Sequence, residues 1–243
     1  MNEHSFLRAF HNVQGGHVLI SPDQGSRFAK DIAGDFNPIH DADSRRFCVP
    51  GDLLFALVLA RYGVSACMHC RFVGMVGAGV ELVFPDEPGE SFAVVDTQGK
   101  RYLEVERSGE TVSDPYTVEA LTRAYVAFSG DNFPHVLVPL MEQNGHMVNT
   151  ERPLVIYERM SLHLREPVGV LTETVQPRLN AAEMNVDGKR GEVRLDYALC
   201  VEGDPFAHGS KHLVLSGLRA FDAVKVEELV SAYAGWKARH ESM

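Results

Sequence analysis

The sequence predicts an α+β fold in which an antiparallel sheet wraps around long buried helices, arranged as two similar halves. Two observations carry this prediction. The segment Leu53–Ala60 is apolar on every side, so a helix there has to be surrounded by protein. Strand-like runs separated by turn residues follow it, and the same order of helix and strands returns later in the 243-residue chain.

The first expected element is a short helix that ends in a sharp turn. Ser21–Gln24 has the residues of a capped helix start, with proline at the first helical position. Phe28–Ala33 supplies an apolar face at helical spacing, and Gly34 suits the left-handed position that closes a helix. The proline after Asn37 favours extended backbone there. We therefore expect Asp35–His40 to form a tight loop directly after the helix.

The next element is the apolar helix, expected from Asp52 to Tyr62 between Pro50-Gly51 and Gly63. After it the pattern changes to short runs rich in β-branched and aromatic residues, separated by proline, glycine and aspartate. These runs predict strands at Arg71–Phe84, Glu90–Asp96, Arg101–Arg107 and Thr117–Phe128.

A weaker copy of this order occupies the second half. Phe133–Met141 is predicted to be a shorter version of the buried helix, which Pro139 would kink. Leu154–Gly169 echoes the strand and turn at Val73–Gly89. Further strands are expected at Leu171–Leu179, Glu192–Val201 and His212–Leu218, and a last amphipathic helix is expected after a cap at Asp222.

A helix wrapped by strands, twice over, is the order of a tandem (double) hot-dog fold. We accordingly predict an N-terminal hot-dog half at residues 1–130 and a C-terminal hot-dog-like half at residues 131–243.

Composition and charge narrow the class of function. The net charge is −10 and no basic block is present, which argues against a nucleic acid or an anionic membrane as the main partner. Cys67–Cys70 has the spacing of a zinc pair, but no second ligand pair completes it, so no metal site is predicted. Met1–Gly16 lacks the pattern of a secretory signal, and Leu53–Ala60 is too short to span a membrane. The expected location is the cytoplasm.

The loop Asp35-Phe36-Asn37-Pro38-Ile39-His40 is the segment with a chemical signature. It places a carboxylate and an imidazole across a rigid turn, where both can face one small pocket. Such a pair can carry general acid–base chemistry. The structural alternative is an ordinary turn at a helix end, with His40 packed or solvated. Spacing alone leaves both interpretations open.

The same residues resemble a known family. Phe28-Ala29, followed by Gly34 and the D-x-N-P-x-H run from Asp35 to His40, is similar to the signature of MaoC-like (R)-specific enoyl-CoA hydratases. The resemblance implies that Asp35 activates water and that His40 assists the proton transfer. It also implies that Asn37 and Pro38 hold the loop.

The resemblance extends to the start of the apolar helix. There Gly51 matches the family's oxyanion-binding glycine, although Pro50-Gly51 stands where the family has histidine and glycine. Arg45 and Arg46 are assigned to substrate binding, where they would meet the phosphates of coenzyme A; a solvated basic pair is the alternative.

The sequence therefore predicts an (R)-specific enoyl-thioester hydratase or dehydratase, a lyase of fatty acid metabolism that acts on acyl-CoA or acyl carrier protein thioesters. No cofactor is expected beyond the thioester substrate, and the sequence is compatible with a homodimer. Two alternatives stay open. One is a hot-dog acyl-thioesterase that uses Asp52 or Asp35, and the other is a non-catalytic acyl-thioester-binding or scaffold protein.

Overall fold

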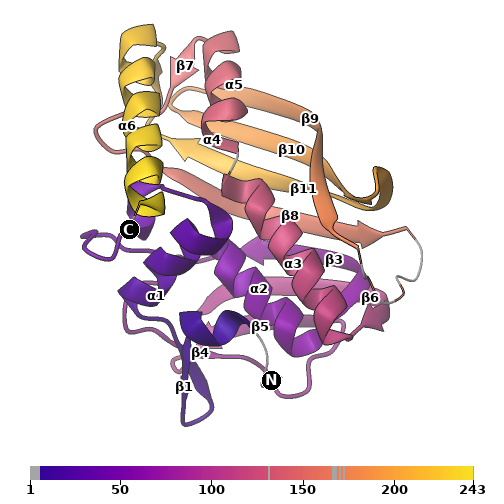
Figure 1. Cartoon of the computed structure of the whole chain (residues 1–243). Helices are drawn as coiled ribbons and strands as arrows, with labels where there is room; N and C mark the ends of the chain where they lie inside the picture. The colour runs from indigo at the N-terminus through magenta and orange to yellow at the C-terminus, as the bar shows by residue number, and fades with distance from the viewer. Residues whose placement is uncertain (1–5, 131, 166–168, 170, 172, 243) are drawn as a thin grey trace.

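The computed structural model describes residues 6–130, 132–165, 169, 171 and 173–242 (Figure 1). They form one ten-stranded sheet whose neighbouring strands are all antiparallel. From edge to edge the strands are β1 (Asn12–Gln14), β2 (His17–Leu19), β4 (Glu81–Val83), β5 (Ser91–Asp96), β6 (Arg101–Val112), β3 (Val64–Phe72), β8 (Val155–Leu164), β11 (Asp204–Ser216), β10 (Arg190–Val201) and β9 (Val175–Asp187). A small second sheet pairs β7 (His146–Met147) with β12 (Arg219–Ala220).

Two long helices, α2 (Gly51–Tyr62) and α3 (Pro115–Gly130), lie side by side on one face of the large sheet (Figure 1). Helix α2 is the apolar helix that the sequence predicts, and its side chains from Asp52 to Leu59 are buried. An antiparallel sheet laid around buried helices is the hot-dog arrangement. The predicted α+β tandem hot-dog fold is therefore confirmed.

Helix α3 corrects one element of the prediction, because the expected strand at Thr117–Phe128 is helical. Its β-branched and aromatic residues have high strand propensity, but their spacing is that of a helix. Val118, Leu121, Tyr125 and Phe128 recur every three or four residues and are buried together. The strand propensity of these residues favours a strand, but the segment is a helix because a helix buries Val118, Leu121, Tyr125 and Phe128 on one face.

Helix α3 also takes the place of the second buried helix, which the sequence puts at Phe133–Met141. That segment instead forms the short helices α4 (Asn132–His135) and α5 (Leu137–Gln143). Because α3 packs on β9 and β10, its contacts are with the later strands as well as with α2. The division of the chain at residue 130 stays a prediction.

The strand bounds differ from expectation in several places. The run Arg71–Phe84 is not one strand, because β3 ends at Phe72 and β4 begins at Glu81. Strand β9 begins at Val175 and runs on to Asp187, past the predicted Leu179. Strand β11 begins at Asp204, well before the predicted His212. The turn expected at Glu166–Val168 lies outside the described residues.

The helix boundaries follow the expected capping signals. The described part of the chain starts with η1 (Phe6–Phe10), and Ser21 then caps α1 (Pro22–Arg27) with the predicted capping box. A short π-helix, η2 (Phe28–Ala33), continues α1 and ends at Gly34, whose φ is +65°. The last helix, α6 (Ala223–Glu241), is capped by Asp222 as predicted.

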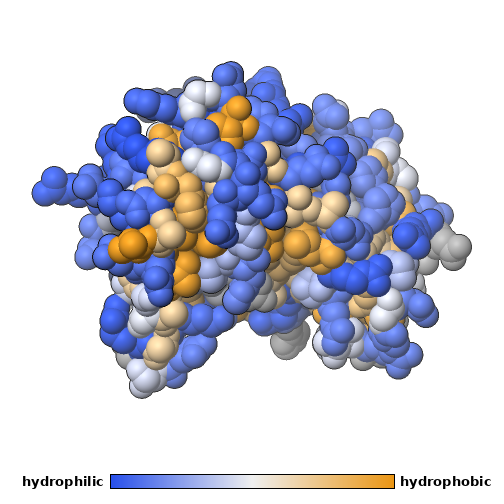
Figure 2. All heavy atoms as spheres, turned by 90° about the horizontal axis from the view of Figure 1, so that it is seen from above, coloured by the Kyte–Doolittle hydropathy of each residue, from blue (hydrophilic) through white to orange (hydrophobic). Residues whose placement is uncertain are grey.

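The surface is mostly hydrophilic, in keeping with the net charge of −10, and bands of apolar side chains interrupt it on the face seen in Figure 2. Among the described residues, no helix combines the length and the apolar character needed to cross a membrane.

Candidate functional site

The D-x-N-P-x-H loop is built by its own hydrogen bonds. The Asn37 backbone N–H donates to Asp35 Oδ1 at 2.9 Å, and the Ile39 N–H donates to Asn37 Oδ1 at 3.2 Å. A single turn of 3₁₀ helix, η3 (Pro38–His40), follows. The Asn37 side chain caps this turn and Pro38 begins it, and their role in supporting a functional loop stays a prediction.

This loop brings the carboxylate and the imidazole together. Asp35 Oδ2 lies 3.7 Å from His40 Nε2, and the two side chains are 21% and 10% exposed. His40 Nδ1 lies 2.7 Å from the carbonyl oxygen of Cys48. Because a carbonyl only accepts, Nδ1 donates there, and Nε2 is the nitrogen that faces Asp35.

Asp35 and His40 face one cavity of about 110 Å³. Gly51 at the start of α2 lines the same cavity, as do Ser129 and Asn132 at the end of α3 and the start of α4. The remaining wall is largely apolar and comes from both parts of the chain, including Val49, Leu54 and Phe72 from the first and Phe133, Leu213 and Trp236 from the second. An apolar cleft with a few convergent polar groups is the usual form of a small-molecule site.

Burial in this cavity raises the pKa of Asp35, and the nearby Asp52 carboxylate raises it further. His40, the Asn37 N–H and Lys211 oppose the rise without cancelling it. A carboxylate with a raised pKa is a stronger base than an ordinary aspartate, which suits proton abstraction near neutral pH.

Directly behind the cavity lies a buried charge pair that the sequence does not predict. Lys211 Nζ lies 3.4 Å from Asp52 Oδ1, and their side chains are 0% and 4% exposed. Lys211 also donates to the Tyr125 carbonyl oxygen at 3.2 Å and to the Ser129 hydroxyl. Burial lowers the pKa of Lys211, and Asp52 partly restores it.

One signal in the sequence would have found Lys211. It shares the inward face of β11 with Leu213 and Leu215 by strict alternation, and all three are buried. The predicted strand began at His212 and so left this lysine outside. Asp52 pairs with Lys211 and is not among the residues that line the cavity.

Asn132 is a second residue that the sequence does not indicate. It is 3% exposed and lines the cavity, and its Nδ2 has no hydrogen-bond partner among the described residues. A buried donor without a partner costs free energy unless a ligand or water supplies an acceptor.

Helix α6 fixes the motif loop from outside. The Tyr233 hydroxyl accepts from the Phe36 N–H at 3.1 Å and donates to the Gly34 carbonyl oxygen at 3.2 Å. On the inner side Gly130 lies so close to the loop that a Cβ there would be 1.9 Å from the Ala33 carbonyl oxygen. The loop is therefore held between α6 and the end of α3.

The other predicted residues fall outside this group. Arg45 and Arg46 are exposed and do not line the cavity, so their role in substrate binding stays a prediction. The direction of the Gly51 N–H as an oxyanion donor also stays a prediction. Cys67 and Cys70 do not act as a pair, since Cys70 is buried in the core and Cys67 is half-buried on the other face of β3.

Comparisons with known proteins give a family and a fold. A family model described as "Protein of unknown function (DUF3581)" matches residues 5–224. A search of curated proteins found no match. The MaoC-like signature is therefore a local resemblance within a chain that matches a different family model.

Several solved structures are similar in fold. A "MaoC-like dehydratase" is 10% identical, with 86% of this chain and 98% of that chain covered and a TM-score of 0.43. A conserved protein with a hot dog fold from Alicyclobacillus acidocaldarius is 10% identical, with coverage of 86% and 96% and a TM-score of 0.41. A tesB protein from Mycobacterium avium subsp. paratuberculosis is 10% identical, with coverage of 69% and 87% and a TM-score of 0.40. Likeness at this level carries no argument about activity.

Proposed function

The chain belongs to the DUF3581 family, and from the geometry of its cavity we propose that it adds water to an enoyl thioester or removes water in the reverse reaction. The observation that carries this proposal is the Asp35–His40 pair, 3.7 Å apart and facing one largely apolar cavity. Hydration needs a base for water and an acid for the substrate carbon within one small space.

The proposed reaction starts with Asp35 ionised and His40 protonated. Asp35 accepts a proton from water while the hydroxyl adds to Cβ of the enoyl group. His40 donates its Nε2 proton to Cα, while Nδ1 keeps its own proton and continues to donate it in the hydrogen bond to the Cys48 carbonyl oxygen. The proton then on Asp35 returns to His40 Nε2 across the short gap, which restores the starting state.

Two groups are placed to assist the substrate carbonyl. Charge gathers on the thioester oxygen as water attacks, and a backbone N–H at a helix start is a suitable donor. Gly51 opens α2 at the cavity wall, and Asn132 Nδ2, which has no hydrogen-bond partner among the described residues, offers a side-chain donor in the same cavity. The apolar wall would hold the acyl chain. We keep Arg45 and Arg46 as the groups for the phosphates of coenzyme A, with an acyl carrier protein as the alternative carrier.

A thioesterase is the second candidate, because a carboxylate that activates water can also attack a thioester carbonyl. The ion pair with Lys211 disfavours Asp52 in this role, which leaves Asp35. A non-catalytic acyl-thioester-binding protein is the third candidate, in which the motif is only a turn.

A panel of trans-2-enoyl and saturated acyl-CoA thioesters tests these candidates together. Loss of the enoyl double bond without release of free thiol supports the hydratase. Release of thiol supports the thioesterase, and saturable binding without either reaction supports the binding protein. Each assay is repeated with Asp35→Asn and His40→Ala, and turnover that is unchanged in both variants would exclude this pair as the catalytic centre.

A further inference from the structure

A second cluster of reactive side chains lies on the outer face of the sheet, away from the helices and the cavity. Cys67 and His69 alternate with the buried Met68 and Cys70 along β3, so they point to the side opposite the core. His163 of β8 is the register partner of Cys67. Cys67 and His69 are two residues apart on β3, and His163 lies directly across from Cys67. The three side chains therefore share a patch of surface.

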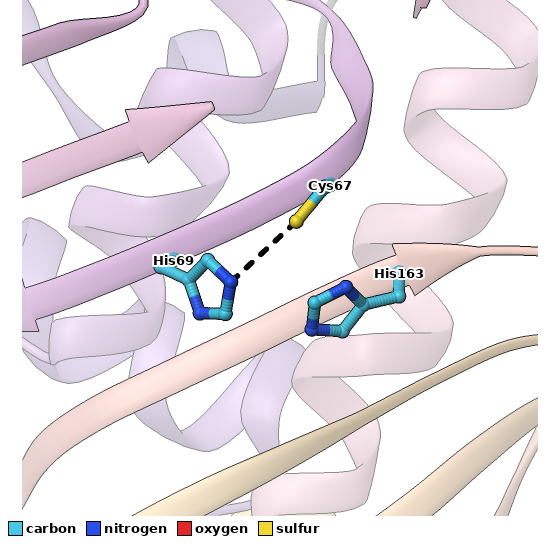
Figure 3. A group of neighbouring side chains, drawn as sticks. All are labelled: Cys67, His69 and His163. Atoms are coloured by element: carbon cyan, nitrogen blue, oxygen red, sulfur yellow. Dashed lines mark hydrogen bonds between the residues drawn. The ribbon is translucent and has the colours of Figure 1, made fainter. Parts of the chain in front are cut away.

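Their ligand atoms converge. Cys67 Sγ lies 3.5 Å from His69 Nε2, and one ligand atom of each of the three residues lies within 4.8 Å of the others (Figure 3). In a tetrahedral zinc site with ordinary zinc–sulfur and zinc–nitrogen bonds, ligand atoms are about 3.3–3.6 Å apart. Small rotations of the two imidazoles would bring the cluster to that spacing.

We propose that Cys67, His69 and His163 form a binding site for a divalent transition metal ion of the zinc class, on the face of the sheet opposite the cavity. One thiolate and two imidazoles are a ligand set that zinc prefers in proteins. The site is independent of the proposed hydratase reaction. It also differs from the Cys67–Cys70 pair that the sequence suggests, because Cys70 points into the core.

The surroundings suit a metal. Glu106 of β6 is the register partner of His69, which puts a carboxylate beside a ligand imidazole. The His208 ring stacks on His163 with centroids 5.3 Å apart and an interplanar angle of 20°. Among the described residues, the group of converging ligand atoms consists of Cys67, His69 and His163, so the proposed tetrahedral site would leave its fourth position to water.

The site also spans a junction in the sheet. Strands β3 and β8 are neighbours at the point where strands from the first part of the chain meet strands from the second. A metal held by Cys67 and His69 on one side and by His163 on the other would join them. Metal binding should therefore raise the melting temperature, because the folded state binds the ion and the unfolded chain binds it less well.

Titration of the reduced, chelator-treated protein with Co²⁺ tests the site. We expect one Co²⁺ per chain, with the visible bands of tetrahedral cobalt and a thiolate-to-cobalt charge-transfer band in the near ultraviolet. Cys67→Ser should abolish the charge-transfer band, and His69→Ala and His163→Ala should each weaken binding by at least about tenfold. His212→Ala removes another half-buried histidine from the same face of the sheet and serves as the matched control, with unchanged binding.

Thermal unfolding with and without Zn²⁺ gives a second measurement. The melting temperature should rise with Zn²⁺ in the wild type and in His212→Ala, and it should not change in Cys67→Ser. A charge-transfer band that persists in Cys67→Ser would place the thiolate elsewhere and overturn the proposal. So would the absence of Co²⁺ binding to the wild type, or equal affinity in the wild type and both ligand-histidine variants. Since His69 is exposed, His69→Ala keeps the test valid if another variant fails to fold.

Discussion

Lys211 Nζ lies 3.4 Å from Asp52 Oδ1, so a lysine in the middle of β11 is tied to the first turn of α2. The pair joins a strand from the second part of the chain to the helix of the first part. It also lies close enough to the cavity for both charges to shift the pKa of Asp35, in opposite directions. A buried pair of this kind fixes the position of two elements even where it adds little net stability.

The first prediction concerns this pair. Lys211→Met and Asp52→Asn should each lower the free energy of unfolding by about 3–5 kcal/mol, because each leaves the other charge buried without its partner. The double variant should lose much less than the sum. Urea unfolding of the four proteins measures the coupling. Arg194→Met, which breaks the exposed pair with Asp196, is the control and should cost less than about 1 kcal/mol. Strictly additive losses would mean that the two charges do not interact.

The second prediction separates catalysis from stability at Asp35. Asp35→Asn keeps the acceptor for the Asn37 N–H but removes the base, so turnover should fall by about 10²–10⁴-fold. The pKa of Asp35 is raised in the folded protein, so this carboxyl favours folding below its unfolded pKa of about 3.9 and loses that contribution as the pH rises through its folded pKa.

An asparagine at position 35 stays neutral, so Asp35→Asn should melt at a higher temperature than the wild type at pH 7. The difference should shrink toward zero below about pH 4. Melting curves across this pH range provide the measurement. If Asp35→Asn is inactive and also less stable than the wild type at pH 7, the role of Asp35 is to hold the loop, and its buried charge does not destabilise the fold.

The third prediction concerns Asn132. If Asn132 Nδ2 donates to the substrate carbonyl, Asn132→Leu should lower kcat/KM by about ten- to a hundredfold, the worth of one good hydrogen bond. The free energy of unfolding should stay the same or rise, because the variant removes a buried donor that has no partner within the described part of the chain. Steady-state kinetics and a melting curve on the same preparation test both statements. Unchanged kcat/KM would leave Gly51 as the remaining proposed donor.

The fourth prediction tests how α6 holds the loop. Tyr233→Phe removes one hydroxyl that bonds both the Phe36 N–H and the Gly34 carbonyl oxygen, and should cost about 1–3 kcal/mol. Turnover should fall with it, since the loop carries Asp35 and His40. Tyr116→Phe, at a residue that is 79% exposed, is the matched control and should change neither quantity. Equal stability in the two variants would show that α6 does not brace the loop.

The fifth prediction concerns the close approach of α3 to the loop. Gly130→Ala would place a Cβ 1.9 Å from the Ala33 carbonyl oxygen, so the backbone has to move. We expect a loss of stability of about 1–3 kcal/mol and a large loss of activity, because the displaced segment leads into Asp35. Gly89→Ala has its nearest contact at 3.9 Å and should be neutral. Full activity in Gly130→Ala would mean that the two segments are free to separate.

The parts of the fold that local chemistry controls were predictable. The capping box at Ser21, the left-handed Gly34 and the cap at Asp222 are all where the sequence puts them. Each depends on hydrogen bonds or backbone angles within a few residues. The buried helix α2 was predictable for a related reason, since a segment that is apolar on every side leaves no face for solvent.

Helix α3 was not predictable from residue preferences. Its threonine, valine, tyrosine and phenylalanine residues favour strands, whereas the helical spacing of its buried side chains matches a face that packs on η2, α2, β9 and β10. The segment Phe133–Met141 is helical as predicted, but it forms the two short helices α4 and α5, and α3 is the second long helix on the sheet.

For the candidate site, the sequence by itself determined the D-x-N-P-x-H turn. Hydrogen bonds between residues two apart, with one proline, suffice to place Asp35 and His40 on the same side. Only the tertiary structure decided what that side faces. The cavity wall, the buried Asn132, the charge pair of Asp52 with Lys211 and the brace from Tyr233 all come from residues far along the chain. Such contacts depend on how segments distant in sequence pack, and no local pattern of spacing or propensity records that packing.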